Sequence, residues 1–216
     1  MHLKRNKMPN TWPVARKGTK YIVNASHAKT KAIPLLFILR EILKLAKTRK
    51  EAEYILHSKE VKVNNKIRTS EKFPVQVFDI VSFEKTKKHY KLTIVNKKFK
   101  LEEISEKDSG KKIVKIIGKS LFSKKRIQMN LEDGQNFIAK EKFSLGDSAI
   151  INTKEMKIEK ILPLKQGADI EVVSGKHAGE KGKLKSIEKL SRGKRYIIKL
   201  QEKEVGLPLK TILVVE

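Results

Sequence analysis

Glycine and lysine recur together in residues 174–196, SGKHAGEKGKLKSIEKLSRGKRY, with only two glutamates among them. The glycines at positions 175, 179 and 182 can adopt positive φ and bring backbone N–H groups against an anion. Lys176, Lys181 and Lys183 would supply positive charge at the same place. The segment is therefore expected to bind phosphate groups, although the same glycines would also form the turns of a small β-barrel.

A second motif, Gly118-Lys119-Ser120, has the last residues of a phosphate-binding loop and lacks the rest of it. The pattern G-x-x-x-x-G-K-[ST] requires a glycine where this chain has Ile113, so the amides that would surround a phosphate are missing. The pair Glu132-Asp133 precedes a glycine between two expected strands, which is typical of a turn. No nucleophile and base stand out, so the sequence predicts no enzyme and no small-molecule substrate.

Residues that bind metals are sparse. No cysteine is present, which excludes disulfides, thiol nucleophiles and thiolate ligands. The histidines show no H-x-x-x-H spacing, and structural or RNA-contacting roles are favoured for them over metal binding. They are His2, His27, His57, His89 and His177. We expect neither a metal nor any other cofactor.

The charge balance indicates a polyanionic partner. The chain has 50 Lys and Arg against 24 Asp and Glu, a net charge of +26, whereas solubility alone calls for a magnitude of about 2 to 8. A protein this basic should bind nucleic acid with a steep salt dependence, because neutralised phosphates release counterions. The longest apolar run, IPLLFIL at 33–39, is far short of a membrane span, and no signal peptide is evident. We expect an intracellular, soluble protein.

The N-terminal 40 residues contain nine basic residues and no acid, interrupted by Pro9, Pro13 and Gly18. This composition predicts an extended basic arm. Trp12 and Tyr21 would anchor the arm on a partner, which we favour over a disordered targeting segment.

Two short helices and a hairpin should follow the arm. Pro34 suits a first helical turn, and Leu35, Leu39 and Ile42 form an apolar stripe that predicts a helix ending near residue 47. Thr48 and Glu51 have the spacing of a capping box that begins a second helix, so that a tight basic turn holds residues 47–50. EVKVNNKIR at 60–68 then predicts a β-hairpin with a basic tip.

The rest of the chain is expected to consist of strands. YKLTIV, KIVKII, RIQMNL, SAIIN and KIEKIL within residues 90–164 predict a small antiparallel barrel or sandwich. Beyond residue 167, DIEVV, GKLKSIE, RYIIKL and TILVV predict a final barrel of some 50 residues. The glycine- and lysine-rich segment would join the first two strands of that barrel and continue through the next turn.

Six segments occur in an order that resembles the ribosomal protein S4e (eS4) family of the archaeal and eukaryotic small subunit. They are HLKR at 2–5, IPLLFILREILKLAKTRKEAEYIL at 33–56, VKVNNKIRT at 61–69, IQMNLEDGQN at 127–136, GDS at 146–148 and QGADIEVVSGKHAGEKGKL at 166–184. The helix-helix-hairpin is similar to an S4 RNA-binding domain, and the last segment is similar to a KOW motif on an SH3-like barrel. The family usually has Asp-Gly where this chain has Asn64-Asn65, and asparagine tolerates left-handed φ.

The resemblance implies an α+β, multi-domain protein. The expected parts are a basic arm at 1–33, an S4-like domain at 34–89, a central β domain at 90–166 and a KOW barrel at 167–216. It also implies a cytoplasmic, ribosome-bound structural protein of archaeal type that binds small-subunit rRNA early in assembly, beside neighbouring ribosomal proteins, as a monomer and with no membrane partner.

The resemblance and the distribution of charge together give the residues expected to contact RNA. They are His2, Lys4, Arg5, Lys7, Trp12, Arg16, Lys17, Lys20, Lys29, Lys31, Lys47, Thr48, Arg49, Lys50, Lys62, Lys66, Arg68, Lys176, His177, Lys181, Lys183, Arg192 and Arg195. The alternative function is a free-standing transcription or RNA-processing factor, because S4 and KOW modules occur there too. An RNA-modifying enzyme would need a catalytic domain that no segment offers.

Overall fold

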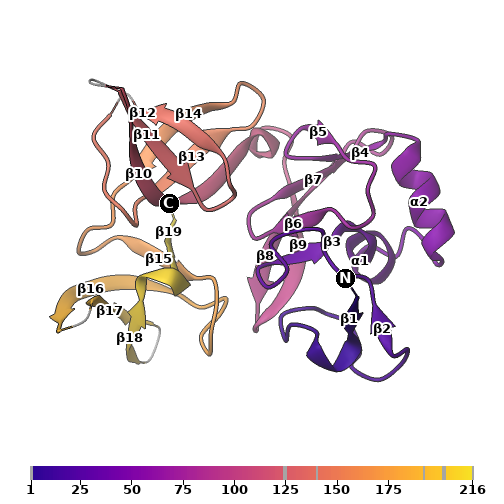
Figure 1. Ribbon diagram of the computed structural model, residues 1–216, viewed down its shortest axis with the longest axis horizontal. Helices are drawn as coiled ribbons and strands as arrows, with labels where there is room; N and C mark the ends of the chain where they lie inside the picture. The colour runs from indigo at the N-terminus through magenta and orange to yellow at the C-terminus, as the bar shows by residue number, and fades with distance from the viewer. Residues whose placement is uncertain (1, 124–125, 140, 192, 201–202, 216) are drawn as a thin grey trace. The chain divides into compact units, whose positions relative to one another are not determined.

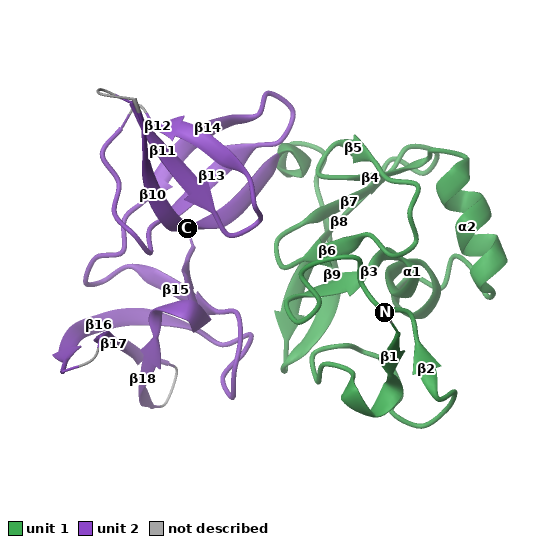
Figure 2. Cartoon of the chain, viewed as in Figure 1, with its two compact units in different colours: residues 1–110 green, residues 111–216 purple. Residues whose placement is uncertain are grey.

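The computed structural model describes residues 2–123, 126–139, 141–191, 193–200 and 203–215 of the chain. They form two compact units, residues 1–110 and 111–216 (Figure 2). Both units consist mainly of antiparallel strands, and the two α-helices lie within residues 35–57 (Figure 1). The protein is therefore mostly β, with two short helices, where the sequence analysis expected an α+β protein. None of the helices in the described ranges is long and apolar enough to cross a membrane.

The first unit is built on one five-stranded sheet and two strand pairs. The sheet has the order β5-β4-β7-β8-β9, and β1 pairs with β2 as β3 does with β6. The strands are β1 (Leu3–Lys4), β2 (Tyr21–Ile22), β3 (Ala32–Pro34), β4 (Val61–Val63), β5 (Lys66–Ile67), β6 (Pro74–Gln76), β7 (Ile80–Phe83), β8 (Lys88–Val95) and β9 (Lys98–Ile104). The helices are α1 (Leu35–Phe37) and α2 (Arg49–His57).

The first helix is shorter than the sequence predicts. After α1 the chain forms a π-helical turn, Ile38–Ile42, and Lys44 adopts a φ of +54° instead of continuing to residue 47. The backbone N–H of Leu43 donates to Ile38 O at 2.9 Å, and that of Leu45 donates to Leu39 O at 2.9 Å, so the last carbonyls are satisfied by a wide closing turn. All of residues 35–39 are buried, so tertiary packing, and not the helical spacing of the apolar residues, determines the backbone conformation here.

The start of α2 and the hairpin turn confirm their predictions. Thr48 and Glu51 form both hydrogen bonds of a capping box. Asn64 and Asn65 have φ of +50° and +62°, the left-handed values that a two-residue hairpin turn needs. The Asn64 amide also donates to Asp79 Oδ1 at 2.9 Å and accepts from the Ile80 N–H at 3.0 Å, which attaches the turn to β7. This bonding explains why asparagine serves in place of Asp-Gly.

The N-terminal segment is not an extended arm. Trp12 is completely buried, its indole N–H donates to Ala32 O at 3.0 Å, and its ring lies 5.2 Å from that of Phe37. The Phe99 N–H donates to Thr11 O at 2.8 Å, so the segment also joins β9. Burying an indole contributes about 2 kcal/mol or more. The segment therefore folds as part of the first unit.

The first compact unit also extends past the expected boundary at residue 90. YKLTIV lies in β8, which pairs with β7 in the register Ile80↔Lys91 and Phe83↔Lys88. β9 pairs with β8 along its whole length, so both strands extend the S4-like sheet. The compact unit ends at Gly110.

The second unit contains two five-stranded antiparallel sheets with the orders β12-β11-β10-β13-β14 and β18-β17-β16-β15-β19. The first sheet is an open half-barrel, since β12 and β14 are its two ends, rather than the closed barrel or sandwich predicted. The strands are β10 (Lys111–Ser123), β11 (Arg126–Leu131), β12 (Asn136–Ala139), β13 (Ser148–Asn152), β14 (Lys157–Leu162), β15 (Asp169–Val172), β16 (Lys181–Leu190), β17 (Gly193–Lys199), β18 (Glu204–Pro208) and β19 (Ile212–Val214).

A buried cluster joins these two sheets. Ile150, Leu162 and Val214 form one buried cluster across them. Lys115 is only 4% exposed, and its ammonium donates to Ile212 O at 2.9 Å and to Leu209 O. Ser148, in the GDS segment, accepts from the Val214 N–H at 3.1 Å. The GDS segment thus serves the junction between the sheets.

Candidate nucleic-acid interface

Three lysines at the helix-hairpin part of the first unit have ammonium groups that form no ion pair among the described residues. Lys47 and Lys50 flank the cap of α2, and Lys66 opens β5 after the Asn64–Asn65 turn. All three are exposed, and within the described ranges no carboxylate pairs with their ammonium groups. We call them the free lysines. Ammonium groups of this kind can contact phosphates without first breaking an ion pair.

Arg49 lies between two of the free lysines but is bound internally. Its guanidinium donates two hydrogen bonds to Glu71, Nε to Oε2 at 2.8 Å and NH2 to Oε1 at 2.5 Å, and Glu53 lies 3.2 Å away. The hydrogen bonds that Arg49 donates to Glu71 and the negative charge of Glu71 raise the pKa of Arg49 above its ordinary value. The pair connects the start of α2 to the segment after the hairpin, so the role of Arg49 is to hold the two parts together.

Three other predicted contacts at this place also have internal roles. Lys62 pairs with Glu84. The Arg68 guanidinium lies over the Phe73 ring at 4.2 Å from its centroid, a cation–π contact. The Thr48 hydroxyl accepts from the Glu51 N–H at 3.3 Å. These side chains shape the surface that carries the free lysines.

The sequence analysis missed Tyr54 as a candidate contact. Its side chain is 77% exposed, and it follows Lys50 by four residues on α2, which places both on one face of the helix. An exposed tyrosine beside a lysine can stack on a base while the ammonium contacts a phosphate. The i,i+4 spacing of Lys50 and Tyr54 in the sequence could have identified this pair.

Two of the N-terminal candidates have roles inside the fold. Trp12 is buried, which corrects its assignment as an RNA contact. The Arg5 guanidinium is also used internally, because it donates to Ala15 O at 2.7 Å and to Thr19 O at 2.8 Å. The other predicted contacts of this segment are exposed to solvent and remain candidates. They are His2, Lys4, Lys7, Arg16, Lys17, Lys20, Lys29 and Lys31.

The glycine- and lysine-rich segment joins β15 to β16 as expected. Gly175 and Gly179 have φ of +99° and +91°, while Gly182 does not have positive φ. Gly182 is required instead by close packing, because a Cβ there would collide with the carbonyl oxygen of Lys199 on β17. Lys176 projects from the loop into solvent, and the His177 Nδ1 lies 3.1 Å from the Glu180 carboxylate. The loop can therefore present Lys176 and its own amides to an anion.

The sheet after this loop carries like charges opposite one another. Lys183 faces Lys199, and Lys189 faces Lys194, across β16 and β17. Like charges in these positions destabilise a sheet, and an external anion would relieve the repulsion. Lys183 also lies 3.9 Å from Asp169, and Lys181 lies 3.9 Å from Glu171.

Of the last two predicted contacts, only Arg195 lies within the described residues, on β17. The Arg195 side chain is exposed and covers Gly206, where a Cβ would approach its Cδ. Arg192 lies outside the described residues. Lys194 and Lys199, by contrast, were not predicted, although the sequence GKRYIIK places them one on each side of the strand's apolar center.

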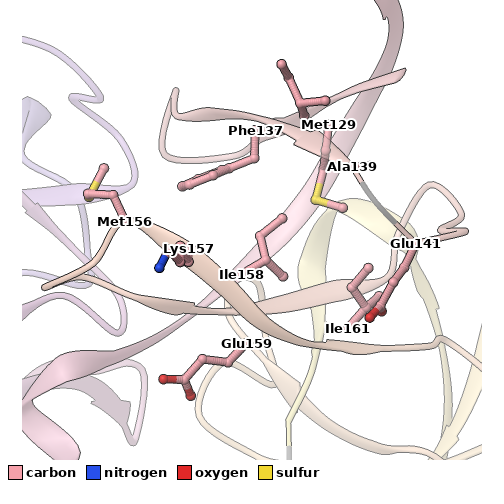
Figure 3. A pocket seen from close by; sticks show the side chains of 10 residues that line it. Met129, Phe137, Ala139, Glu141, Met156, Lys157, Ile158, Glu159 and Ile161 are labelled. Carbon is pink, nitrogen blue, oxygen red and sulfur yellow. The ribbon is translucent and has the colours of Figure 1, made fainter. Parts of the chain in front are cut away.

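A groove of about 280 Å3 opens between the end strands β12 and β14 of the half-barrel (Figure 3). Its lining is mainly apolar, with Met129, Phe137 and Ile158 among the side chains that Figure 3 labels. At its rim, Glu159 accepts from the Asn152 amide at 2.9 Å and lies 3.6 Å from the Lys111 ammonium. The groove thus offers an apolar surface with a paired carboxylate. No cluster of three or more metal-binding side chains occurs in the described part of the chain.

Sequence comparisons identify two known modules in this chain. The family described as "Ribosomal family S4e" matches residues 85–158, and the S4 domain matches residues 35–81. The small ribosomal subunit protein eS4 of Methanosphaera stadtmanae is 37% identical over 209 residues, covering 95% of this chain and 86% of the relative. The eS4 protein of Methanocella arvoryzae is 35% identical, covering 86% and 80%.

The fold is also similar to a solved structure. The crystal structure of the 30S ribosomal protein S4e from Thermoplasma acidophilum matches with a TM-score of 0.74 at 24% sequence identity. The match covers 86% of this chain and 95% of that one. It supports the arrangement of strands and helices within the units described above.

Proposed function

This chain belongs to the ribosomal protein S4e family, and from that premise we propose that it is a structural component of the small ribosomal subunit that binds small-subunit rRNA. The family consists of ribosomal proteins, and the chain is a structural protein rather than an enzyme. The proposal places the chain on the ribosome as a monomer, in contact with rRNA and with neighbouring ribosomal proteins, and early in subunit assembly.

The single observation that carries the proposal is the set of free lysines around the cap of α2 and the hairpin turn. The S4 domain match spans all three of them. The capping box orders the backbone around Lys47 and Lys50, and the hydrogen bonds of Asn64 with Asp79 and Ile80 hold the turn before Lys66, so the charges are positioned before RNA arrives. Prepositioned cations contact phosphates at a lower entropic cost than cations on a disordered tail.

Two further surfaces contribute to the proposal. The loop between β15 and β16, with Lys176 at its tip, is the proposed KOW contact, and the pairing of β19 with β15 supports an SH3-like barrel there. The exposed cations of residues 2–31 would contribute phosphate contacts from the folded N-terminal segment. Phosphate contacts of this kind position a protein on RNA and do not read its sequence. We propose that the chain recognises the shape of the folded rRNA rather than its base sequence.

Sedimentation tests the proposal. The full chain is mixed with small ribosomal subunits depleted of their own S4e protein, and the mixture is run through a gradient at moderate salt. We expect stable co-migration with the subunit, and a variant with all three free lysines changed to alanine should be displaced at lower salt than the wild type. Recovery of the wild-type chain only at the top of the gradient would instead favour a free-standing RNA-binding factor.

A further inference from the structure

The long hairpin of β10 and β11 exposes apolar side chains that no internal contact explains. Leu121 is 82% exposed and Phe122 is 63% exposed, near the tip of the hairpin. Ile117, on the same strand, is 57% exposed. Exposed groups of this size close together on one ribbon indicate a surface that something else covers.

Two β-bulges account for the positions of Ile117 and Phe122. The register passes from Ile116↔Leu131 to Gly118↔Asn130, which makes Ile117 an extra residue on β10. It passes again from Leu121↔Ile127 to Ser123↔Arg126, which makes Phe122 the second extra residue. Bulges re-aim side chains and are often found beside functional sites.

A flat polar strip lies beside the bulges. Gly118 leaves room for the Asn130 side chain, whose amide nitrogen would be 3.0 Å from a Cβ at that position. The Asn130 amide donates to Ser120 Oγ at 3.0 Å and accepts from the Gln128 amide at 2.9 Å. The Gly118-Lys119-Ser120 motif, which is not a phosphate loop, therefore forms part of an open sheet surface with amide groups on it.

The charge of this hairpin identifies the class of partner. Residues 117–131, the outer part of the hairpin, contain four Lys and Arg and no acid. Of these, Arg126 is exposed opposite Ser123, and Lys119 is exposed with its ammonium 5.1 Å from the centroid of the Phe143 ring. A protein partner with an ordinary mixed surface gives no reason for a ribbon without carboxylates, whereas RNA does.

We propose that this hairpin binds an unpaired nucleotide of RNA, with Phe122 stacking on the base and Arg126 and Lys119 contacting the adjoining phosphates. An aromatic side chain cannot reach the bases inside an A-form duplex, so the site requires a splayed base from a loop, bulge or single strand. Stacking of this kind tolerates any base because every base has a π-face. The inference rests on the proposed function, because it names the RNA element that one part of the same protein binds.

The test uses the full chain and a single-stranded RNA oligonucleotide that contains one fluorescent 2-aminopurine. Binding of the wild type should quench the fluorophore, because stacking on Phe122 alters its emission. Phe122→Ala should remove the quenching and weaken binding of the oligonucleotide by about fivefold or more, within the range for base–aromatic stacking. Phe122→Trp should restore both, and Leu145→Ala, which changes another exposed apolar residue of the same unit, should change neither.

A fourth variant separates stacking from apolar docking. Phe122→Leu keeps an apolar side chain but has no π-face, so it should behave as Phe122→Ala with the RNA. If Phe122→Leu binds the oligonucleotide as the wild type does, or if Phe122→Ala affects only association with ribosomal proteins, the surface docks on protein and the inference is overturned. Because all variants keep the free lysines, a failure here leaves their binding to structured rRNA unchanged, whereas loss of all rRNA binding by the wild type would overturn the proposed function itself.

Discussion

Arg49 and Glu71 form a two-pronged ion pair that joins the cap of α2 to the segment following the hairpin, with Nε–Oε2 and NH2–Oε1 distances of 2.8 and 2.5 Å. Glu71 has 9% of its side chain exposed, and Arg49 has 54%. The carboxylate is thus nearly buried while the guanidinium is partly solvated. Arg49, which the sequence analysis expected to contact RNA, instead holds the start of α2 against the segment after the hairpin.

Arg49→Ala should destabilise the first unit. Its removal leaves the Glu71 carboxylate nearly buried without its main counter-charge, and we expect a loss of about 1–3 kcal/mol after allowance for solvent screening at the exposed arginine. Urea unfolding measures the change. Lys50→Ala, at the next position, should cost less than about 0.5 kcal/mol because Lys50 has no carboxylate partner in the described structure. Equal stabilities of the two variants would show that the ion pair contributes nothing.

The N-terminal turn of α2 should depend on pH through Glu51. Hydrogen bonds from the Lys47 N–H and from Thr48 lower the pKa of Glu51 below its ordinary value of 4.5. A carboxyl group whose pKa is lowered by folding stabilises the fold above the pKa of the unfolded chain, and that contribution is lost as the pH falls through the lower folded value. The Lys47 and Thr48 amide proton shifts should therefore titrate below pH 4.5.

Glu51→Gln provides the control for that titration. Glutamine can keep the capping hydrogen bonds but cannot ionise, so the Lys47 and Thr48 amide shifts should stay constant over the same pH range. Identical titration curves in the wild type and the variant would mean that another group, and not the capping carboxylate, controls the turn.

The free lysines should govern the salt dependence of RNA binding. Replacing Lys50 or Lys66 by alanine should reduce the magnitude of the slope of log K against log salt by up to about 0.7–0.9 each, because one phosphate contact and its released counterions are lost. The effect should be similar for different RNA sequences. Filter binding at several salt concentrations measures it, with Lys157→Ala, whose ammonium pairs with Glu155 at 3.1 Å, as the control. An unchanged slope in both variants would show that Lys50 and Lys66 do not contact phosphates.

Lys115 should stabilise the second unit. Lys115→Met leaves the carbonyls of Leu209 and Ile212 without the buried ammonium, and we expect a loss of about 1–3 kcal/mol in the free energy of unfolding. Methionine also removes the desolvation cost of a buried charge, which opposes this loss. Urea unfolding compared with that of the exposed Lys119→Met decides between the two effects. A Lys115→Met protein as stable as the wild type would show that the desolvation cost cancels the hydrogen bonds.

Most of the strands that the sequence predicts are inner strands of their sheets. RIQMNL, SAIIN and KIEKIL correspond to β11, β13 and β14, because alternating or continuous apolar residues give a clear signal. Among the strands that the sequence analysis missed, β9, β12 and β18 are end strands of their sheets. An end strand has one unpaired edge and keeps many polar side chains, and β18 also contains Gly206 and Pro208. The alternation of apolar and polar residues that predicts a strand is therefore weak in end strands.

Charged candidates are the other part that the sequence could not resolve. Composition predicts that lysine and arginine contact RNA, but it does not show which of them are already paired. Arg5, Arg49 and Lys62 are bound within the fold, while Lys47, Lys50 and Lys66 are not. The difference depends on partners between 10 and 22 residues away in the sequence, which only the folded chain brings together.

The most direct test of the account is a comparison of rRNA binding by the folded chain with binding by an unfolded lysine-rich peptide of the same net charge of +26. Both are titrated against a structured small-subunit rRNA fragment at moderate salt, with duplex DNA of equal charge as competitor. The account predicts that the folded chain prefers the rRNA fragment strongly while the peptide does not. If the two bind rRNA equally and are displaced equally by DNA, positioned cations are not the basis of recognition.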